Sequence, residues 1–174
     1  MLRYHPGNKN RGESLIEILV TIAIIGLTMV TLLGLASLSW STLVLMRQIT
    51  LANNIAQETM EAVRNFRDGT FWNNDDPQDK YDGLGVLTAG ISYHPEKSTD
   101  NPPRWMMISG EQTADGFTRK VIFENVMRDG NDNIVVGGGI DDPGTKKVTV
   151  TVSWQERERP HQVKLVTYLT NWKQ

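Results

Sequence analysis

Hydrophobic residues are concentrated in one uninterrupted stretch near the N-terminus of this 174-residue chain. Between Ile18 and Met46, 29 consecutive residues carry no charge, and twenty of them are apolar while nine are Thr, Ser or Gly. A helix of this length would measure about 43 Å, whereas the hydrocarbon core of a bilayer is roughly 30 Å thick. The pattern predicts a membrane-spanning helix that is tilted or is partly covered by other protein.

The helical pattern continues beyond the uncharged stretch, but there it becomes amphipathic. Apolar residues recur at spacings of three and four, with charged residues between them: Ile49, Ala52, Ala56, Met60 (or Thr59), Val63 and Phe66. No proline occurs within 13–68, and Gly69 is a candidate C-cap. We therefore expect one helix that is apolar all round in its first half, 13–46, and amphipathic in its second half, 47–69.

The remaining residues read as a β domain. Residues 70–103 are rich in Asn, Asp, Pro and Gly, which indicates an irregular connection with a short turn or strand near 86–92. Strand patterns follow at 104–109, 117–128, 146–154 and 163–172, and 155–162 reads as a charged hairpin loop. We expect an α+β protein in which one face of an antiparallel sheet over 70–174 packs on the amphipathic half of the helix.

Valine alternation marks the most regular of these strands. Val148, Val150, Val152 and Trp154 fall on one face, and Lys147, Thr149, Thr151 and Ser153 fall on the other. We expect the tryptophans of the sheet to serve in packing, at Trp105, Trp154 and Trp172.

Charge is segregated along the chain, so its formal net charge of −2 is a misleading average. Residues 1–12 carry +3, residues 13–46 carry −2 and residues 47–174 carry −3. By the positive-inside rule the N-terminus is expected in the cytoplasm and the C-terminal domain outside it. The absence of cysteine excludes disulfides, cysteine-ligated metal sites and a thiol nucleophile. The slightly acidic balance argues against nucleic acid as a partner, because Arg119-Lys120 and Lys146-Lys147 are only short basic pairs.

Three kinds of N-terminal segment fit a long apolar stretch. A cleaved secretory signal has an apolar core of about 7–15 residues followed by a small-residue cleavage site, and neither feature is present. An uncleaved signal anchor explains the length and the orientation. It does not explain Glu17, which directly precedes the uncharged stretch. An acid at the start of the helix can reach the interface, but deeper in the membrane it would cost about 2.5–3.5 kcal/mol, so Glu17 is a candidate functional residue.

The third kind of segment is marked by the residues around this glutamate. Residues 11–17 read Arg-Gly-Glu-Ser-Leu-Ile-Glu and lead directly into the apolar stretch. This segment resembles the N-terminal signature of type IV pilins and of the pseudopilins of type II secretion. In that family a prepilin peptidase cuts after a glycine that ends a short basic leader, and a glutamate stands five residues later. Gly12 matches that glycine, and Glu17 matches that glutamate.

The resemblance implies processing of residues 1–12 as a leader. We expect cleavage between Gly12 and Glu13, which makes the Glu13 amine the candidate for N-methylation. Glu13 departs from the family pattern, because that position is usually Phe. Removal of the leader would change the net charge from −2 to −5 and would remove the basic residues that hold the N-terminus in the cytoplasm.

The resemblance also gives Glu17 an assembly role, because the family glutamate is thought to pair with the α-amine of a neighbouring subunit. Either charge alone in an apolar bundle is costly, so the pair would select a register between subunits. The implied partners are the prepilin peptidase, other pilin or pseudopilin subunits, the inner-membrane assembly platform and the membrane. Because the Glu13 carboxylate could compete for the amine, and the last two strands loosely resemble those of minor pilins, we expect an initiating or minor subunit.

Two loops of the C-terminal domain are candidates for metal binding. Clustered carboxylates could hold calcium, although a solvated acidic loop is the interpretation we favour: Asp75, Asp76, Asp79 and Asp82. Residues 129–133 have the spacing of a calcium-loop start, but Ile134 stands where the loop glycine belongs, so we interpret them as a turn. We therefore expect no cofactor.

Catalytic patterns are lacking in the sequence. His94 and His161 are isolated and read as surface histidines, and Gly137-Gly138-Gly139 lacks the lysine of a phosphate-binding loop and reads as a flexible loop. We expect a structural subunit of a type IV pilus or a type II secretion pseudopilus, not an enzyme. The alternative is an uncleaved, signal-anchored extracytoplasmic module for binding or adhesion.

Overall fold

One long helix precedes an antiparallel sheet. The computed structural model of the chain describes residues 11–78 and 80–172, and for 11–14 only the backbone. Helix α1 covers Arg11–Gly69, 59 residues, and so contains the whole of the predicted helix. The chain forms two compact units, Met1–Met46 and Arg47–Gln174. The α+β class predicted from the sequence is confirmed.

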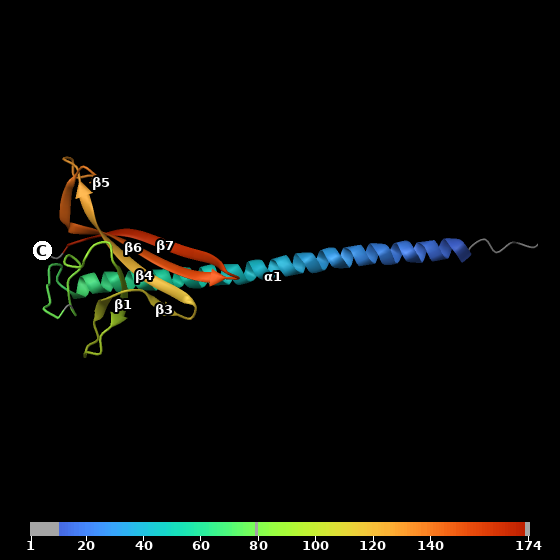
Figure 1. The fold of residues 1–174 in the computed structure, drawn as a ribbon, viewed down its shortest axis with the longest axis horizontal. Helices are drawn as coiled ribbons and strands as arrows, with labels where there is room; N and C mark the ends of the chain where they lie inside the picture. The colour runs from blue at the N-terminus through green and yellow to red at the C-terminus, as the bar shows by residue number, and fades with distance from the viewer. Residues whose placement is uncertain (1–10, 79, 173–174) are drawn as a thin grey trace, which may run out of the picture. The chain divides into compact units, whose positions relative to one another are not determined.

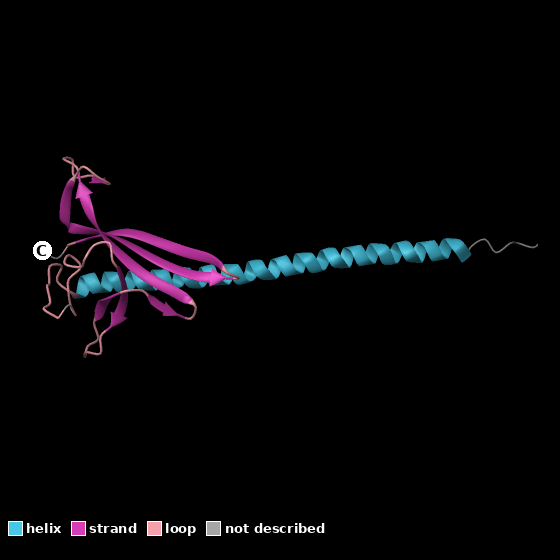
Figure 2. Cartoon of the chain, viewed as in Figure 1, coloured by secondary structure: helices cyan, strands magenta, loops and turns pink. Residues whose placement is uncertain are grey.

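The second unit contains all the strands, coloured magenta in Figure 2. Five of them form the sheet in the order β2-β1-β4-β6-β7, and β3 and β5 each pair with β4. Every pairing is antiparallel. The strands are β1 (Ser92–Lys97), β2 (Trp105–Ser109), β3 (Gln112–Ala114), β4 (Phe117–Arg128), β5 (Ile134–Val135), β6 (Ile140–Glu156) and β7 (Arg159–Thr170).

One face of the sheet packs on the helical residues after Arg47. The predicted amphipathic face is buried, with Ala52, Ala56 and Val63 wholly inaccessible to solvent. The two alanines leave room for the sheet to approach the helix closely. From the sheet, alternate residues of β4 and β6 enter the same cluster, as the period of two requires: Val121, Phe123, Val148, Val150, Val152 and Trp154. The alternation predicted for 146–154 is therefore confirmed.

The irregular segment after α1 also contributes to the core. Trp72, Leu84 and Leu87 are buried in the same cluster as the helix and the sheet. Gly83 is required where the segment crosses itself, because a Cβ there would lie 2.1 Å from the Phe71 carbonyl oxygen. The short turn or strand predicted near 86–92 is a turn, in which the Val86 amide donates to the Gly83 carbonyl oxygen at 3.0 Å, and strand β1 begins only at Ser92. The reason is the burial of Tyr93 and Pro95, whose alternation fits a strand between β2 and β4.

The predicted charged loop 155–162 is a much tighter hairpin. Strand β6 continues to Glu156 and β7 begins at Arg159, so only Arg157 and Glu158 form the turn. Both turn residues have positive φ, 47° and 66°, which matches the twist of the flanking strands. Pro160 is tolerated within β7 because β7 is an edge strand of the sheet. The charges in this segment did not indicate a longer loop.

The ends of β4 and β6 leave the sheet together and form a projection, which we call the arm (126–142). Asn125 pairs with Lys146, but the next residue, Val126, pairs with Asp142, so three residues of β6 bulge out between these pairs. A bulge of this kind redirects a strand pair. In Figure 1 the arm carries β5 away from the rest of the sheet. The predicted strand 146–154 was therefore too short, because β6 already begins at Ile140.

Two of the three consecutive glycines of the arm, at 137–139, have a specific backbone requirement. A Cβ on Gly139 would lie 2.5 Å from the Arg128 carbonyl oxygen, and Gly138 has a φ of 76°. Residues 137–139 lie in a loop between β5 and β6, as predicted, and Gly139 allows a close approach to the Arg128 backbone that a side chain would prevent.

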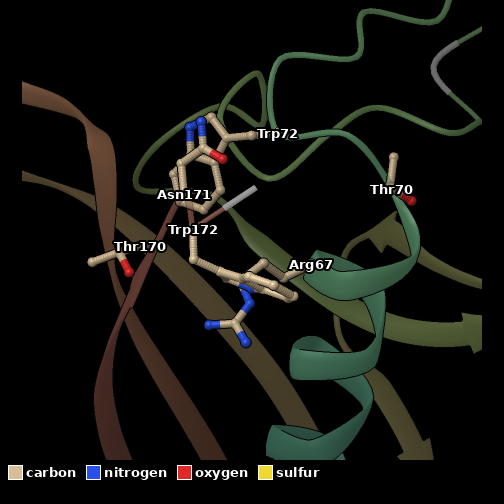
Figure 3. A pocket seen from close by; sticks show the side chains of 6 residues that line it. All are labelled: Arg67, Thr70, Trp72, Thr170, Asn171 and Trp172. Carbon is tan, nitrogen blue, oxygen red and sulfur yellow. The ribbon is translucent and has the colours of Figure 1, made fainter. Parts of the chain in front are cut away.

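The base of the arm is joined to the end of α1. The indole nitrogen of Trp72 donates to the Pro143 carbonyl oxygen at 2.9 Å, and the Asn171 amide donates to the Gly144 carbonyl oxygen at 2.8 Å. Figure 3 shows the residues at this junction, which line a small pocket. Trp172 is 60% exposed there and donates to Asp68, so its predicted role in the sheet core is wrong. It follows β7, which ends at Thr170.

A matched pair of phenylalanines tests this core. Phe123 is wholly buried between helix and sheet, whereas Phe71 is 78% exposed. Phe123→Ala should lower the free energy of unfolding by about 3–5 kcal/mol, because it removes a buried ring and leaves a cavity. Phe71→Ala should change it by less than about 0.5 kcal/mol. Denaturant unfolding of the full chain in detergent, followed by tryptophan fluorescence, measures both, and equal effects would contradict the described core.

Candidate functional site

The first unit presents its apolar side chains outward. From Leu15 onward α1 contains an 18-residue window with a mean hydropathy of 2.6, and none of that window is buried. Apart from the half-buried Leu45, the large apolar side chains from Leu15 to Met46 are exposed along the helix, so the described part of the chain gives them little cover. The length and composition of this segment suit a membrane-spanning helix.

Most hydroxyl groups in this segment are satisfied within the helix. Five of them donate to carbonyl oxygens three or four residues earlier, at 2.7–3.0 Å: Thr21, Thr28, Thr31, Ser41 and Thr42. Burial of an unpaired hydroxyl is unfavourable in lipid or in an apolar bundle. These five groups therefore bring no unpaired donor into such an environment, and the segment suits both surroundings.

The predicted processing residues lie in the first turn of α1. Gly12 and Glu13 have helical backbone, their side chains are not described, and leader residues 1–10 lie outside the described residues. Glu17 is exposed one turn later, and its carbonyl oxygen accepts the Thr21 hydroxyl. Four residues correspond to about 6 Å of helix rise, so Glu17 lies one turn from the residue that would carry a new α-amine.

The carboxylates of the acidic loop are used to close the loop. Asp82 accepts the Asp76 amide at 2.8 Å, and Asp76 accepts the amides of Gln78 and Tyr81 at 3.2 and 3.0 Å. Asp75 is exposed, and Asp79 lies outside the described residues. Among the described residues there is no group of three or more His, Asp or Glu side chains placed to hold a metal ion.

The loop at the tip of the arm is a turn organised by one carboxylate. Asp129 Oδ1 accepts the amides of Asn131 and Asn133, both at 2.9 Å. The hydrogen bonds from the Asn133 amide and side chain hold the pKa of Asp129 below its usual range. This arrangement agrees with the interpretation of residues 129–133 as a turn between strands.

Both histidines of the domain have specific neighbours. His94 Nδ1 lies 3.2 Å from the Gly110 carbonyl oxygen. The His161 ring stacks on Trp154 at 5.4 Å between centroids. Both are partly exposed, which agrees with a surface position, although neither is isolated from its neighbours. Neither of these two contacts pairs a histidine with a hydroxyl nucleophile, and the stack on Trp154 is a packing contact.

We did not predict the arm as a structural element from the sequence. Its signal was present, because Ile134-Val135-Val136 and Ile140 stand between turn residues. We interpreted the flanking residues separately, as a turn and a glycine loop. The ion pair that organises the arm joins residues 14 apart, since Arg128 Nε donates to Asp142 Oδ2 at 2.7 Å. A pairing across a strand bulge cannot be inferred from sequence spacing.

Comparison with known proteins bears on the first unit. Residues 7–33 match the family model described as the prokaryotic N-terminal methylation motif. This match confirms that the chain carries the prepilin-type N-terminal motif predicted for residues 11–17. Its assignment as a minor subunit remains a prediction. No curated protein and no solved structure matched the chain significantly.

The ion pair of the arm makes stability depend on pH in the acid range. The hydrogen bond from Arg128, with smaller contributions from Thr145 and the Gly144 amide, lowers the pKa of Asp142 from 3.8. A lowered folded-state pKa stabilises the protein above the unfolded value, and this stabilisation is lost as the pH falls through the folded value. Asp142→Asn should therefore flatten the loss of unfolding free energy below about pH 4. Unfolding between pH 2 and 7 measures this, and unchanged acid dependence would contradict the assignment.

Proposed function

We propose that this chain is a structural subunit of a type IV pilus or a type II secretion pseudopilus, processed after Gly12 and assembled through the first half of α1. The observation that carries the proposal is the methylation motif at residues 7–33, which runs into a helix whose apolar side chains are unburied. A helix of this kind needs lipid or other helices around it, and a filament subunit meets both in turn.

Processing would change the anchoring of the subunit. Residues 1–12 carry three basic and no acidic side chains, and basic residues hold a segment on the cytoplasmic side. Their removal by prepilin peptidase leaves an apolar helix whose only acidic side chains are Glu13 and Glu17 within 13–46. The C-terminal domain stays on the extracytoplasmic side, and the shortened helix can leave the bilayer with it as the filament grows.

Glu17 would select the register between neighbouring helices. Between residues 14 and 46 it is the only charged side chain, so this segment offers it no cation of its own. In an apolar bundle the compensating cation would be the α-amine of a neighbouring subunit. Because an unpaired buried charge costs several kcal/mol, registers that leave Glu17 unpaired are disfavoured. The pair thus specifies the stagger of the subunits more than it adds stability.

Two glycines of the leader test the processing step. In cells that contain a prepilin peptidase, the native chain should lose residues 1–12, because the peptidase cuts after Gly12. Gly12→Ala should retain them, whereas Gly7→Ala, a matched substitution within the leader, should be processed normally. Intact-mass measurement of the purified chains distinguishes these results. An intact native N-terminus would instead indicate the uncleaved signal anchor.

The register role of Glu17 is tested by filament incorporation. Glu17→Ala should be processed and inserted normally but should enter filaments at least about tenfold less, a ratio equivalent to 1.4 kcal/mol. Glu58→Ala, which removes an exposed glutamate from the second half of the same helix, should leave incorporation unchanged. Immunoblotting of sheared filament fractions against membrane fractions gives the ratio. Normal incorporation of Glu17→Ala would show that the carboxylate does not select the register.

A further inference from the structure

The arm presents an exposed apolar surface on a well-ordered support. Ile134 and Ile140 lie opposite Arg128 on the two flanking strands, so the three side chains share one face. Ile140 is 81% exposed, and Val136 at the tip is fully exposed. Arg128 is paired with Asp142 and Asp132, which fixes the strands relative to one another. Exposed apolar residues gathered on a rigid projection mark an interaction surface.

The net negative charge of the second unit is located in the arm. Residues 126–142 contain one arginine and four aspartates, a net charge of −3. This equals the net charge of residues 47–174, so the rest of that unit is neutral overall. A surface that binds the arm should therefore combine apolar side chains with basic ones.

One surface of the same unit has that combination. Alternate residues of β7 face away from the core and form what we call the β7 row: Lys164, Val166 and Tyr168. Val166 is 54% exposed, and Tyr168 is exposed beside it. Strand β7 contains two basic residues and no acidic residue. Lys147 of β6 lies opposite Tyr168 and is paired with Glu124 at 2.9 Å, so Lys164 supplies the unpaired basic charge of the β7 row in the described ion pairs. In the described part of the sheet β7 is an edge strand, so one of its sides is open.

We propose that the arm of one subunit docks on the β7 row of a second copy of this chain. The apolar tip residues of the arm would cover Val166 and Tyr168, and the aspartates of the arm would lie near Lys164 and Lys147. The two surfaces are different parts of the chain, so the contact is heterologous. Heterologous contacts that do not close into a ring propagate as a helical assembly, which is the symmetry of a filament.

This inference goes beyond the proposed function, because it uses only residues of the C-terminal domain. It also has a consequence for the copy number. A subunit that docks on its own kind occurs in many copies, whereas the expectation of a minor subunit implies few. The two therefore predict opposite outcomes for contacts between copies.

Cross-linking tests the contact directly, because the native chain has no cysteine. Two differently tagged full-length chains, one with Val136→Cys and one with Val166→Cys, are produced together beside the prepilin peptidase and the assembly machinery. A short bis-maleimide applied to intact cells should link residue 136 of one copy to residue 166 of another. The 136–136 and 166–166 products should be several-fold weaker.

Substitutions of matched exposure define the control. Ile140→Ser should reduce the 136–166 product to background, whereas Phe71→Ser, at a residue of similar exposure away from the arm, should not. Lys164→Glu should also reduce the product, and so should high salt. A dominant 136–136 product, a link only to a different protein, or no product above that of a Phe71→Cys control would each overturn the inference.

The same sample separates this inference from the proposed function. Its intact mass reports whether residues 1–12 have been removed. Loss of the leader without the 136–166 product overturns the docking contact alone. Retention of the leader overturns the proposed processing, whatever the cross-link shows.

Discussion

The uncovered apolar surface of the first unit is the constraint on which the rest of the account depends. Residues 18–46 carry no charge, and the described chain buries none of their most apolar window. Five of their hydroxyls bond to the backbone of their own helix, which suits both lipid and an apolar bundle. Glu17 is the exception, because a charged carboxylate is unfavourable both in lipid and in an apolar bundle unless a cation pairs with it. In the function proposed above, removal of the leader and pairing of Glu17 together transfer the helix from lipid into a bundle.

The second unit solves a different problem, because it must be stable without disulfides. It does so by packing, with Ala52 and Ala56 admitting the valines of β6 and the ring of Phe123 to the helix surface. Trp72 fastens the loop after α1 to the base of the arm through its bond to the Pro143 carbonyl oxygen. The arm can therefore project from the sheet as a rigid element. Its acidic and apolar surface stands apart from a domain that is otherwise neutral.

Sequence patterns predicted the elements whose signal is local. The helical face from Ala52 to Phe66 and the alternation of Val148, Val150 and Val152 are periodic, and both are buried as expected. The features that were predicted wrongly or not at all depend on interactions between residues distant in sequence or on backbone conformation. Charged residues at 155–162 suggested a loop, but positive φ at Arg157 and Glu158 allows a two-residue turn. The arm depends on a bulge and on the Arg128–Asp142 pair, which no spacing rule reveals. Of the candidate site, Gly12 and Glu17 could be predicted only from a motif, because the partners proposed for them belong to other molecules.

The central claim is that the first half of α1 exchanges lipid for protein after the leader is removed. A spin label on Leu33→Cys reports this most directly, because that side chain is 69% exposed and the native chain has no other cysteine. Oxygen, which concentrates in lipid, should reach the label while the subunit rests in the membrane. Once the assembly machinery is active, the label on the processed chain should lose that accessibility in the filament fraction. A label that stays accessible to oxygen in processed chains under every condition would contradict the account.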